Sequence, residues 1–264
     1  MLKIENVCKT FNAGTINEKK ALNGLNLHLK PGEFVTVIGG NGAGKSTMLN
    51  SVAGVYPVDE GKIIIDGEDV THLPEFKRAR VIGRVFQDPM MGTAATMQIE
   101  ENLALAMRRG KKRGLRSGIT KQEREDYRER LKILDLGLED RMTAKVGLLS
   151  GGQRQALTLL MATLQKPKLL LLDEHTAALD PKTAAKVLEA TQRIVERDNL
   201  TTLMITHNMR DAIAYGNRLV MMYNGHIVVD VSGEEKKKLT VEQLLNLFSK
   251  ASGSNEASDK MLLS

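Results

Sequence analysis

The sequence predicts an α/β fold built on a largely parallel sheet. Short apolar runs that resemble strands alternate along the chain with longer helical runs. Leu169–Leu172 and Thr201–Ile205 contain no charged residue, which is typical of strands buried on both faces of a parallel sheet. Because each such strand is followed or preceded by a helical run, helices are expected to cover the faces of the sheet.

The first half of the chain supplies three of these strands. Phe34–Ile38 is apolar and rich in β-branched residues, stops at glycines and leads into a helical run at Thr47–Val52. Lys62–Ile65 is a predicted strand that ends at the turn Asp66-Gly67, and Val81–Phe86 is another.

In the second half, helices are expected over residues 151–165 and 181–197, on either side of Leu169–Leu172. Arg218–Met222 and His226–Val229 flank a turn at residues 223–225 that contains Asn-Gly, which is the signal of a β-hairpin.

Residues 98–146 differ from the rest, because they have few β-branched runs and many helix-forming residues. Lys121–Leu134 is predicted as an amphipathic helix whose apolar side carries Tyr127, Leu131 and Leu134. Arg108–Arg116 is a basic connector broken by glycines, either solvated or placed near anionic lipid or a partner. We therefore expect a helical subdomain inserted into the α/β core.

Near the end of the chain, Thr240 and Gln243 have the spacing of a capping box and predict a helix over Val241–Phe248. The polar tail Ala251–Ser264 is expected to be disordered.

Composition excludes several classes of protein. With 264 residues, 42% hydrophobic and 27% charged, the chain is neither collagen-like nor wholly disordered. A single cysteine, Cys8, excludes an internal disulfide framework. No apolar run is long enough to span a bilayer, and no signal peptide is expected. The net charge of +6 would suit an anionic partner, but basic and aromatic residues are not interleaved, so nucleic acid is not expected as a partner.

A phosphate-binding loop follows the strand Phe34–Ile38. Residues 39–46 read GGNGAGKS and match the pattern G-x-x-x-x-G-K-[ST] between a strand and a helix. The glycines let backbone N–H groups surround an anion, Lys45 can neutralise the β- and γ-phosphates, and the Ser46 hydroxyl can bind Mg²⁺. The alternative, a glycine-rich turn with an incidental lysine, does not explain this context. The expected nucleotide-binding residues are Gly39, Gly40, Asn41, Gly42, Ala43, Gly44, Lys45, Ser46 and Thr47.

A second signature, LSGGQ, covers residues 149–153 and opens the predicted helix 151–165. Ser150 is a good N-cap, and glycines there leave backbone N–H groups exposed. Taken alone, it is a capped helix start.

Two acidic residues, Asp173 and Glu174, follow the four leucines of Leu169–Leu172. The carboxyl ends of parallel strands are where ligands bind in open sheets. Asp173 suits a contact to Mg²⁺ as the acidic counterpart of Ser46, and Glu174 suits the general base that activates a water. Taken alone, the pair would suit a solvated turn.

In this order, the phosphate loop, LSGGQ and the acidic strand end resemble the ATP-binding subunit of an ABC (ATP-binding cassette) transporter. The resemblance covers residues 1–235 and implies a P-loop NTPase (RecA-like) core at about 1–97 and 147–235, with an N-terminal antiparallel β subdomain and a helical subdomain at about 98–146. Residues 236–264 would form a C-terminal helix and a tail.

The resemblance also implies roles for residues outside these motifs. Phe11 is similar to the aromatic residue that stacks on adenine. Gln87 is similar to the glutamine that contacts Mg²⁺ and the water and senses the membrane partner. Asp180 ends a segment, from Ala177, that resembles the loop crossing the dimer interface, and His207 is similar to the histidine that contacts the γ-phosphate.

In this family two copies pair head to tail, which implies that ATP lies between the phosphate loop of one copy and Ser150, Gly151, Gly152 and Gln153 of the other. Glu174, His207, Gln87 and Lys45 are the expected catalytic residues, and Ser46, Gln87 and Asp173 the expected magnesium site. The resemblance further implies ATP and Mg²⁺ as cofactors, membrane permease subunits, an extracytoplasmic solute-binding protein, and a peripheral place on the cytoplasmic face of the inner membrane.

One departure from the family pattern bears on function. His175 stands where most relatives have proline, and either orients Glu174 or is a tolerated variant. The DEHTAALDP run, the helix after LSGGQ and the loop Asn12–Lys20 resemble a bacterial importer subgroup tied to aromatic amino acids. An export motor for lipoproteins or peptides, a soluble ABC ATPase of DNA repair or translation, and a small-molecule kinase are the alternatives. A kinase would leave LSGGQ and His207 unexplained.

Overall fold

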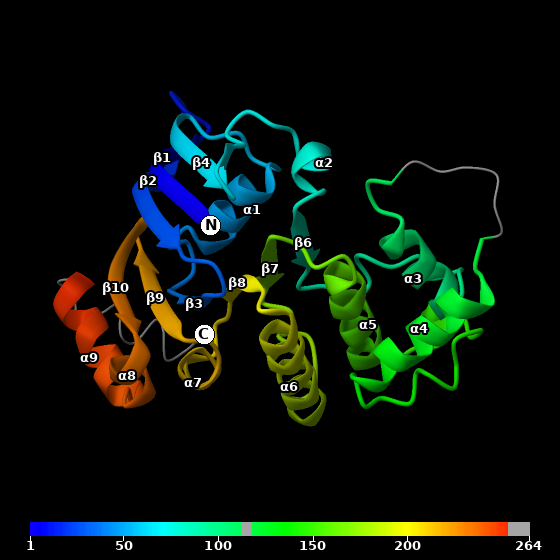
Figure 1. The fold of residues 1–264 in the computed structure, drawn as a ribbon. Helices are drawn as coiled ribbons and strands as arrows, with labels where there is room; N and C mark the ends of the chain where they lie inside the picture. The colour runs from blue at the N-terminus through cyan, green and yellow to red at the C-terminus, as the bar shows by residue number, and fades with distance from the viewer. Residues whose placement is uncertain (112–117, 253–264) are drawn as a thin grey trace.

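Two β-sheets form the framework of the computed structural model, which describes residues 1–111 and 118–252 (Figure 1). The larger sheet has the strand order β10-β9-β3-β8-β7-β6 within this described part. Its strands are β3 (Phe34–Ile38), β6 (Ile82–Val85), β7 (Leu169–Asp173), β8 (Thr201–Ile205), β9 (Arg218–Tyr223) and β10 (His226–Ser232). All neighbours pair in parallel except β9 and β10, which form the hairpin expected at residues 223–225. The prediction of a mostly parallel α/β sheet is confirmed.

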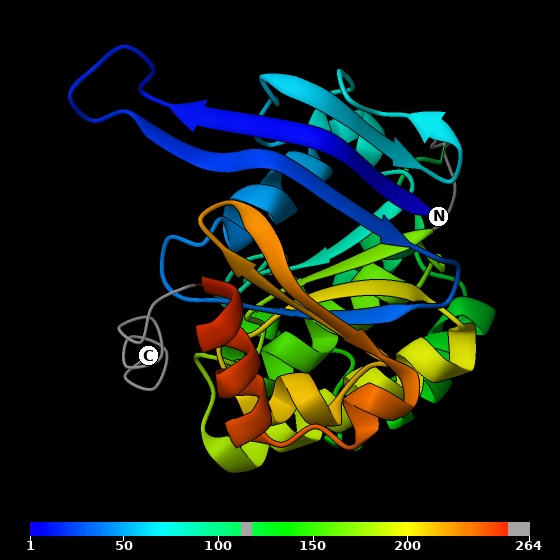
Figure 2. The same cartoon turned by 90° about the vertical axis from the view of Figure 1, so that its left-hand side faces the viewer.

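The smaller sheet is antiparallel and has the order β2-β1-β4-β5. It consists of β1 (Leu2–Phe11), β2 (Lys19–Leu29), β4 (Glu60–Ile65) and β5 (Glu68–Asp69). The N-terminal antiparallel β subdomain is therefore confirmed. The hairpin between β1 and β2 projects beyond the remainder of the chain (Figure 2).

Helices cover the faces of the sheets and follow most strands. They are α1 (Lys45–Ala53), α2 (Glu75–Arg78), α3 (Ile99–Met107), α4 (Lys121–Lys132), α5 (Gly151–Thr163), α6 (Pro181–Asp198), α7 (Met209–Ala214), α8 (Gly233–Lys237) and α9 (Val241–Ser252), with a 3₁₀ turn at Val146–Leu148. No helix within residues 1–111 and 118–252 is long and apolar enough to cross a membrane.

The four leucines of β7 show why a continuous apolar run predicts a fully buried strand. Leu170 and Leu172 join the cluster under α5 and α6, whereas Leu169 and Leu171 join the cluster on the opposite face, under α1 and the smaller sheet. All four side chains are completely buried. Alternate side chains of a strand point to opposite faces, so both faces must be covered.

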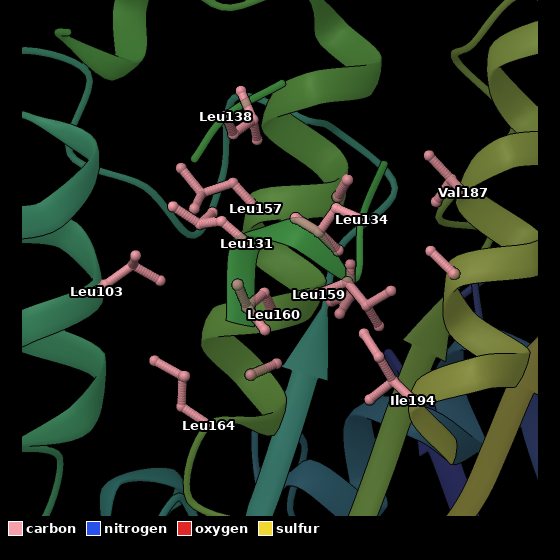
Figure 3. Packing of buried hydrophobic residues seen from close by; sticks show 14 of the residues in the cluster. Leu103, Leu131, Leu134, Leu138, Leu157, Leu159, Leu160, Leu164, Val187 and Ile194 are labelled. Carbon is pink, nitrogen blue, oxygen red and sulfur yellow. The ribbon is translucent and has the colours of Figure 1, made fainter. Parts of the chain in front are cut away.

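Helices α3, α4 and α5 pack through a leucine-rich cluster that includes Leu103, Leu131 and Leu160 (Figure 3). Tyr127 and Leu131 are buried, as the amphipathic pattern predicts. The helix itself ends at Lys132, two residues earlier than predicted, while Leu134 packs into the same cluster from the following turn.

The ends of the segment 98–146 meet in the structure. Gln98 forms a β-bridge with Lys145, and the backbone N–H of Ile99 donates to the carbonyl of Ala144 at 3.0 Å. An ion pair between the buried Glu100 and the half-exposed Arg124 joins the first two helices of the segment, since Arg124 Nε lies 2.7 Å from Glu100 Oε2.

The C-terminal helix α9 begins at the expected capping box: Thr240 N–H donates to Gln243 Oε1 at 2.9 Å, and Gln243 N–H donates to Thr240 Oγ1 at 3.2 Å. Disorder was predicted from Ala251, but Ala251 and Ser252 are the last residues of this helix. The rest of that prediction, residues 253–264, lies outside the described residues, as do residues 112–117 of the basic connector.

Candidate nucleotide-binding site

A cavity of about 350 Å³ opens over the loop between β3 and α1. The loop lines it from Asn41 to Thr47, and side chains from three other places complete the wall. These are Phe11 at the end of β1, Lys19 and Ala21 on β2, and Glu174 after β7.

Close backbone approaches explain two glycines of this loop. Gly44 has φ +101°, and a Cβ there would lie 2.5 Å from the Ala21 carbonyl oxygen. A Cβ on Gly39 would lie 2.4 Å from the carbonyl oxygen of Met222 on β9. Any side chain at either position would push the loop away from the strands that support it.

Lys45, the first residue of α1, is almost completely buried. Its Nζ donates to the Gly39 carbonyl at 2.6 Å and to the Gly40 carbonyl at 3.3 Å. Burial lowers the pKa of Lys45, and the nearby carboxylates of Glu174 and Asp173 act in the opposite direction. The loop thus holds an ammonium group at its inner end.

The two acidic residues differ in their surroundings. Asp173, the last residue of β7, lies next to Arg84 of β6, with Arg84 Nη2 3.7 Å from Asp173 Oδ2. Burial raises the pKa of Asp173, and Arg84 opposes that rise. Arg84 is fixed by a hydrogen bond from Nη2 to Asn50 Oδ1 at 2.7 Å.

Glu174 has a left-handed backbone, with φ +45°, which is uncommon for a non-glycine residue. Its N–H donates to the carbonyl of Ile205 at 3.0 Å, so the end of β7 is tied to the end of β8. The same strand end leads to His207, whose Nδ1 lies 3.8 Å from Glu174 Oε2. The structure therefore brings Glu174 and His207 together beside the phosphate loop.

Phe11 is held from the side by Tyr56: the ring centroids are 5.3 Å apart and the planes meet at 83°. Lys9 Nζ lies 5.7 Å from the Phe11 centroid and is itself paired with Asp59 at 2.8 Å. Phe11 lines the cavity, as expected for a residue that stacks on a base.

Ten of the predicted residues do not line this cavity, among them Gly39, Gly40, Asp173 and His207, which adjoin residues that do. Gln87 is exposed just after β6, and Ser150, Gly151, Gly152 and Gln153 open α5. Ser150 Oγ accepts from the Gln153 N–H at 3.3 Å, completing a capping box. Asp180 likewise stands apart and caps α6, accepting from the Thr183 N–H at 3.1 Å.

His175 is buried, and its Nε2 lies 3.1 Å from Thr191 Oγ1 on α6. Burial lowers the pKa of His175 to about 4. Its hydrogen-bond partner within the described residues is thus Thr191, and of the two alternatives, the one in which it orients Glu174 gains no support from the geometry.

Sequence reasoning missed Lys19 and Ala21 of the cavity wall and the position of Arg84 next to Asp173. The antiparallel pairing that sets Lys19 opposite Phe11 leaves no short motif. Arg84, one position before the end of β6, also belongs to no short motif.

Comparison with known proteins identifies the family of this chain. A family model described as ABC transporter matches residues 22–177, more than half of the chain. The chain belongs to the ABC transporter ATP-binding family. It is an ATPase with a P-loop fold, and ATP is its nucleotide.

Two curated relatives illustrate the range of this family. The chain is 44% identical to the tyrosine transport ATP-binding protein of Clostridioides difficile over 94% of this chain and 98% of the relative. It is 34% identical to the spermidine/putrescine import ATP-binding protein PotA of Haemophilus influenzae, over 94% of this chain but 61% of that relative. These importer-type relatives identify the chain as the ATPase subunit of a transporter.

Among solved structures, the fold of this chain is similar to that of a dimeric ATP-binding cassette in a post-hydrolysis state bound to ADP and Pi. The TM-score is 0.74 and the identity 33%, over 88% of this chain and 98% of that one. A second cassette in its ADP conformation matches with a TM-score of 0.75 and 25% identity.

Proposed function

We propose that this ABC ATPase is the motor subunit of a bacterial importer and that hydrolysis takes place at the cavity over the phosphate loop. The observation that carries the proposal is that Glu174 lines the same cavity as Lys45 and Ser46. A base and a phosphate-binding lysine then face the same nucleotide. Glu174, His207, Gln87 and Lys45 are the proposed catalytic residues.

In the proposed reaction a water attacks the γ-phosphorus of ATP and Glu174 takes a proton from it. A P–O bond to the water oxygen forms, the bond from the γ-phosphorus to the bridging oxygen breaks, and ADP leaves with its electron pair. His207, 3.8 Å from Glu174, is placed to contact the γ-phosphate. Lys45 and the loop amides stabilise the charge on the phosphates.

Ser46, Asp173 and Gln87 are the proposed Mg²⁺ site. No group of three or more acidic, histidine or cysteine side chains gathers within the described residues. A few oxygen donors beside a triphosphate suit Mg²⁺, which keeps several waters and takes phosphate oxygens as ligands. When bound, Mg²⁺ would neutralise charge that develops on the phosphates.

The LSGGQ residues stand outside the cavity, so we propose that they act on the nucleotide of a second copy. Ser150, Gly151, Gly152 and Gln153 would then contact ATP held by the partner's phosphate loop, with Asp180 near the same interface. A dimeric relative of 33% identity supports a paired arrangement. Binding of ATP would close the dimer and hydrolysis would open it.

A second cavity, between α3, α5 and β6, is proposed as the docking site for the permease. Arg84, Arg108, Arg109 and Lys111 line it together with apolar Leu105 and Met161. The Nε of Arg109 is buried without a hydrogen-bond partner in the described residues, and burial lowers the pKa of Arg109. Such a cavity suits an amphipathic permease segment that carries an acidic residue, and it would join the proposed helical subdomain 98–146 to the core of the 1–235 domain.

Two proposals, that transport is inward and that the solute is an amino acid, are based on the similarity to the importer-type relatives. We propose an amino acid as the solute, with tyrosine the first to test, because the tyrosine transport relative aligns over 98% of its length. An extracytoplasmic solute-binding protein would deliver it to the permease. The ATPase would then sit peripherally on the cytoplasmic face of the inner membrane, without nucleic acid as a partner.

The test is capture of the complex. A tagged Glu174→Gln protein is extracted from source-cell membranes in mild detergent and in the presence of ATP, and its partners are identified by mass spectrometry. The Lys45→Ala protein, extracted in the same way, is the control, because it should not form the ATP-bound closed dimer. Recovery of a multi-span permease with a solute-binding protein that binds tyrosine supports the proposal. Recovery of a lipoprotein- or peptide-export permease would mean that transport is outward. Recovery of ribosomes or DNA without any membrane protein would overturn the transport role.

A further inference from the structure

Lys19 lies in the nucleotide cavity although it belongs to no motif. It is the first residue of β2, and in the antiparallel register it stands directly opposite Phe11. Both residues line the cavity. A lysine is therefore placed beside the residue proposed to stack on adenine.

The side chain of Lys19 reaches the phosphate loop. Its Nζ lies 3.3 Å from the point that a Cβ on Gly42 would occupy. Lys45 lies at the inner end of the same loop, where its ammonium is bound by the carbonyls of Gly39 and Gly40. Two ammonium groups thus lie close to the loop, one near Gly42 and the other at the carbonyls of Gly39 and Gly40.

Lys19 is also available for a ligand. Within residues 1–111 and 118–252 its side chain has no ion pair and no hydrogen bond, whereas Lys9, on the neighbouring strand, is paired with Asp59 at 2.8 Å. An exposed lysine without a carboxylate partner, aimed over backbone amides that bind anions, adds positive charge where a nucleotide phosphate would lie.

We propose that Lys19 is a second phosphate-binding lysine of this site, contacting the ATP phosphates between the adenine and Lys45. The inference rests on the proposed binding of ATP in this cavity. Its ammonium donates charge-assisted hydrogen bonds to phosphate oxygens, as the ammonium of Lys45 does. The β1–β2 hairpin thereby takes part in nucleotide binding through a cation as well as an aromatic ring.

The test compares Lys19→Met with Lys20→Met. Lys20 is the neighbouring exposed lysine, its side chain points to the other face of the strand, and it does not line the cavity. The two variants have the same net charge. Affinities for ATP, ADP, AMP and adenosine are measured by displacement of a fluorescent ATP analogue, at low and high salt.

Lys19→Met is expected to weaken ATP and ADP binding on the order of 5-fold, the weight of a charge-assisted hydrogen bond discounted for an exposed lysine. The loss should shrink at high salt, because the interaction is screened. Adenosine binding and the melting temperature should not change, Lys19→Arg should retain most of the affinity, and Lys20→Met should match the wild type. If Lys19→Met also weakens AMP binding, the contacted phosphate is the α-phosphate; if it does not, the contact is to the β- or γ-phosphate.

Equal ATP affinity in Lys19→Met and Lys20→Met would overturn the proposal, and so would a loss as large for adenosine as for ATP. If the wild-type protein itself did not bind ATP, the proposed function of the cavity would fail instead, so the two failures are distinguishable. Lys19→Arg keeps the charge and the length of the side chain, and it provides a test even if Lys19→Met folds poorly.

Discussion

His207 Nδ1 lies 3.8 Å from Glu174 Oε2, although 32 residues of sequence separate the two side chains. Adjacent parallel strands bring them together, since Asp173 of β7 is in register with Ile205 of β8. The left-handed backbone of Glu174 and its hydrogen bond to the Ile205 carbonyl fix the direction in which the chain leaves the sheet. The pair is therefore a product of the sheet register.

Glu174→Gln should lower ATP turnover on the order of 10²–10⁴-fold while ATP binding survives, because an amide cannot accept the proton of the attacking water. Steady-state phosphate release and nucleotide affinity measure the two effects separately. His207→Ala is the companion variant, and it should also lose turnover with little change in affinity. Turnover close to that of the wild type in Glu174→Gln would remove Glu174 from the role of base.

Lys45→Ala should weaken ATP binding itself, on the order of 10–100-fold, because a buried counter-charge to the phosphates is lost. Equilibrium titration with a fluorescent ATP analogue measures the change. Lys62→Ala, on an exposed position of β4, is the control and should bind ATP normally. Unchanged affinity in a folded Lys45→Ala protein would contradict the assigned contact.

Much of this fold could be predicted because its signals are local. The run Leu169–Leu172 predicted a strand covered on both faces, and its leucines do alternate between the two cores. The phosphate loop and the acidic strand end were predicted by short patterns with a direct physical meaning. Residues that owe their position to pairing between distant segments were missed, such as Lys19 opposite Phe11.

Gly152 is a second residue whose structural role depends on a distant segment and could not be predicted from the sequence. The sequence suggested that it exposes a backbone N–H at the start of α5. In the structure a Cβ on Gly152 would lie 1.9 Å from Thr183 Cγ2 of α6, so this glycine also permits the two helices to pack closely. No pattern around residue 152 reports which side chain of a later helix will lie against it.

Gly152→Ala should therefore destabilise the fold by about 1–3 kcal/mol, the usual cost of overpacking. Gly151→Ala should not, because its Cβ would make only an ordinary contact at 3.6 Å with Leu179. Chemical denaturation of both variants measures the difference. The double variant Gly152→Ala, Thr183→Ala should recover most of the lost stability, since it removes the clashing methyl group. Equal stability of the two single variants would show that α5 and α6 are not packed this closely.

The hydrogen bonds of Thr191 fix the state of the buried His175 ring. Thr191 Oγ1 donates to the carbonyl of Val187 at 2.8 Å, so it accepts from His175 Nε2 at 3.1 Å. A neutral ring with its proton on Nε2 satisfies this contact. Charging the ring would place an uncompensated cation in the protein interior, which is the reason that burial lowers the pKa of His175 to about 4.

Stability should consequently fall as the pH falls through the range from about 6.5 to about 4. In that range the unfolded chain takes up a proton on His175 and the folded chain does not, so protonation favours unfolding, by at most about 3 kcal/mol. The contribution is fully present above pH 6.5. His175→Gln keeps a hydrogen-bonding group but does not titrate, so its unfolding free energy, measured by urea titration at a series of pH values, should fall less steeply than that of the wild type. Carboxylates titrate in both proteins and cancel in the comparison, and parallel curves would mean that His175 is solvated or charged in the native state.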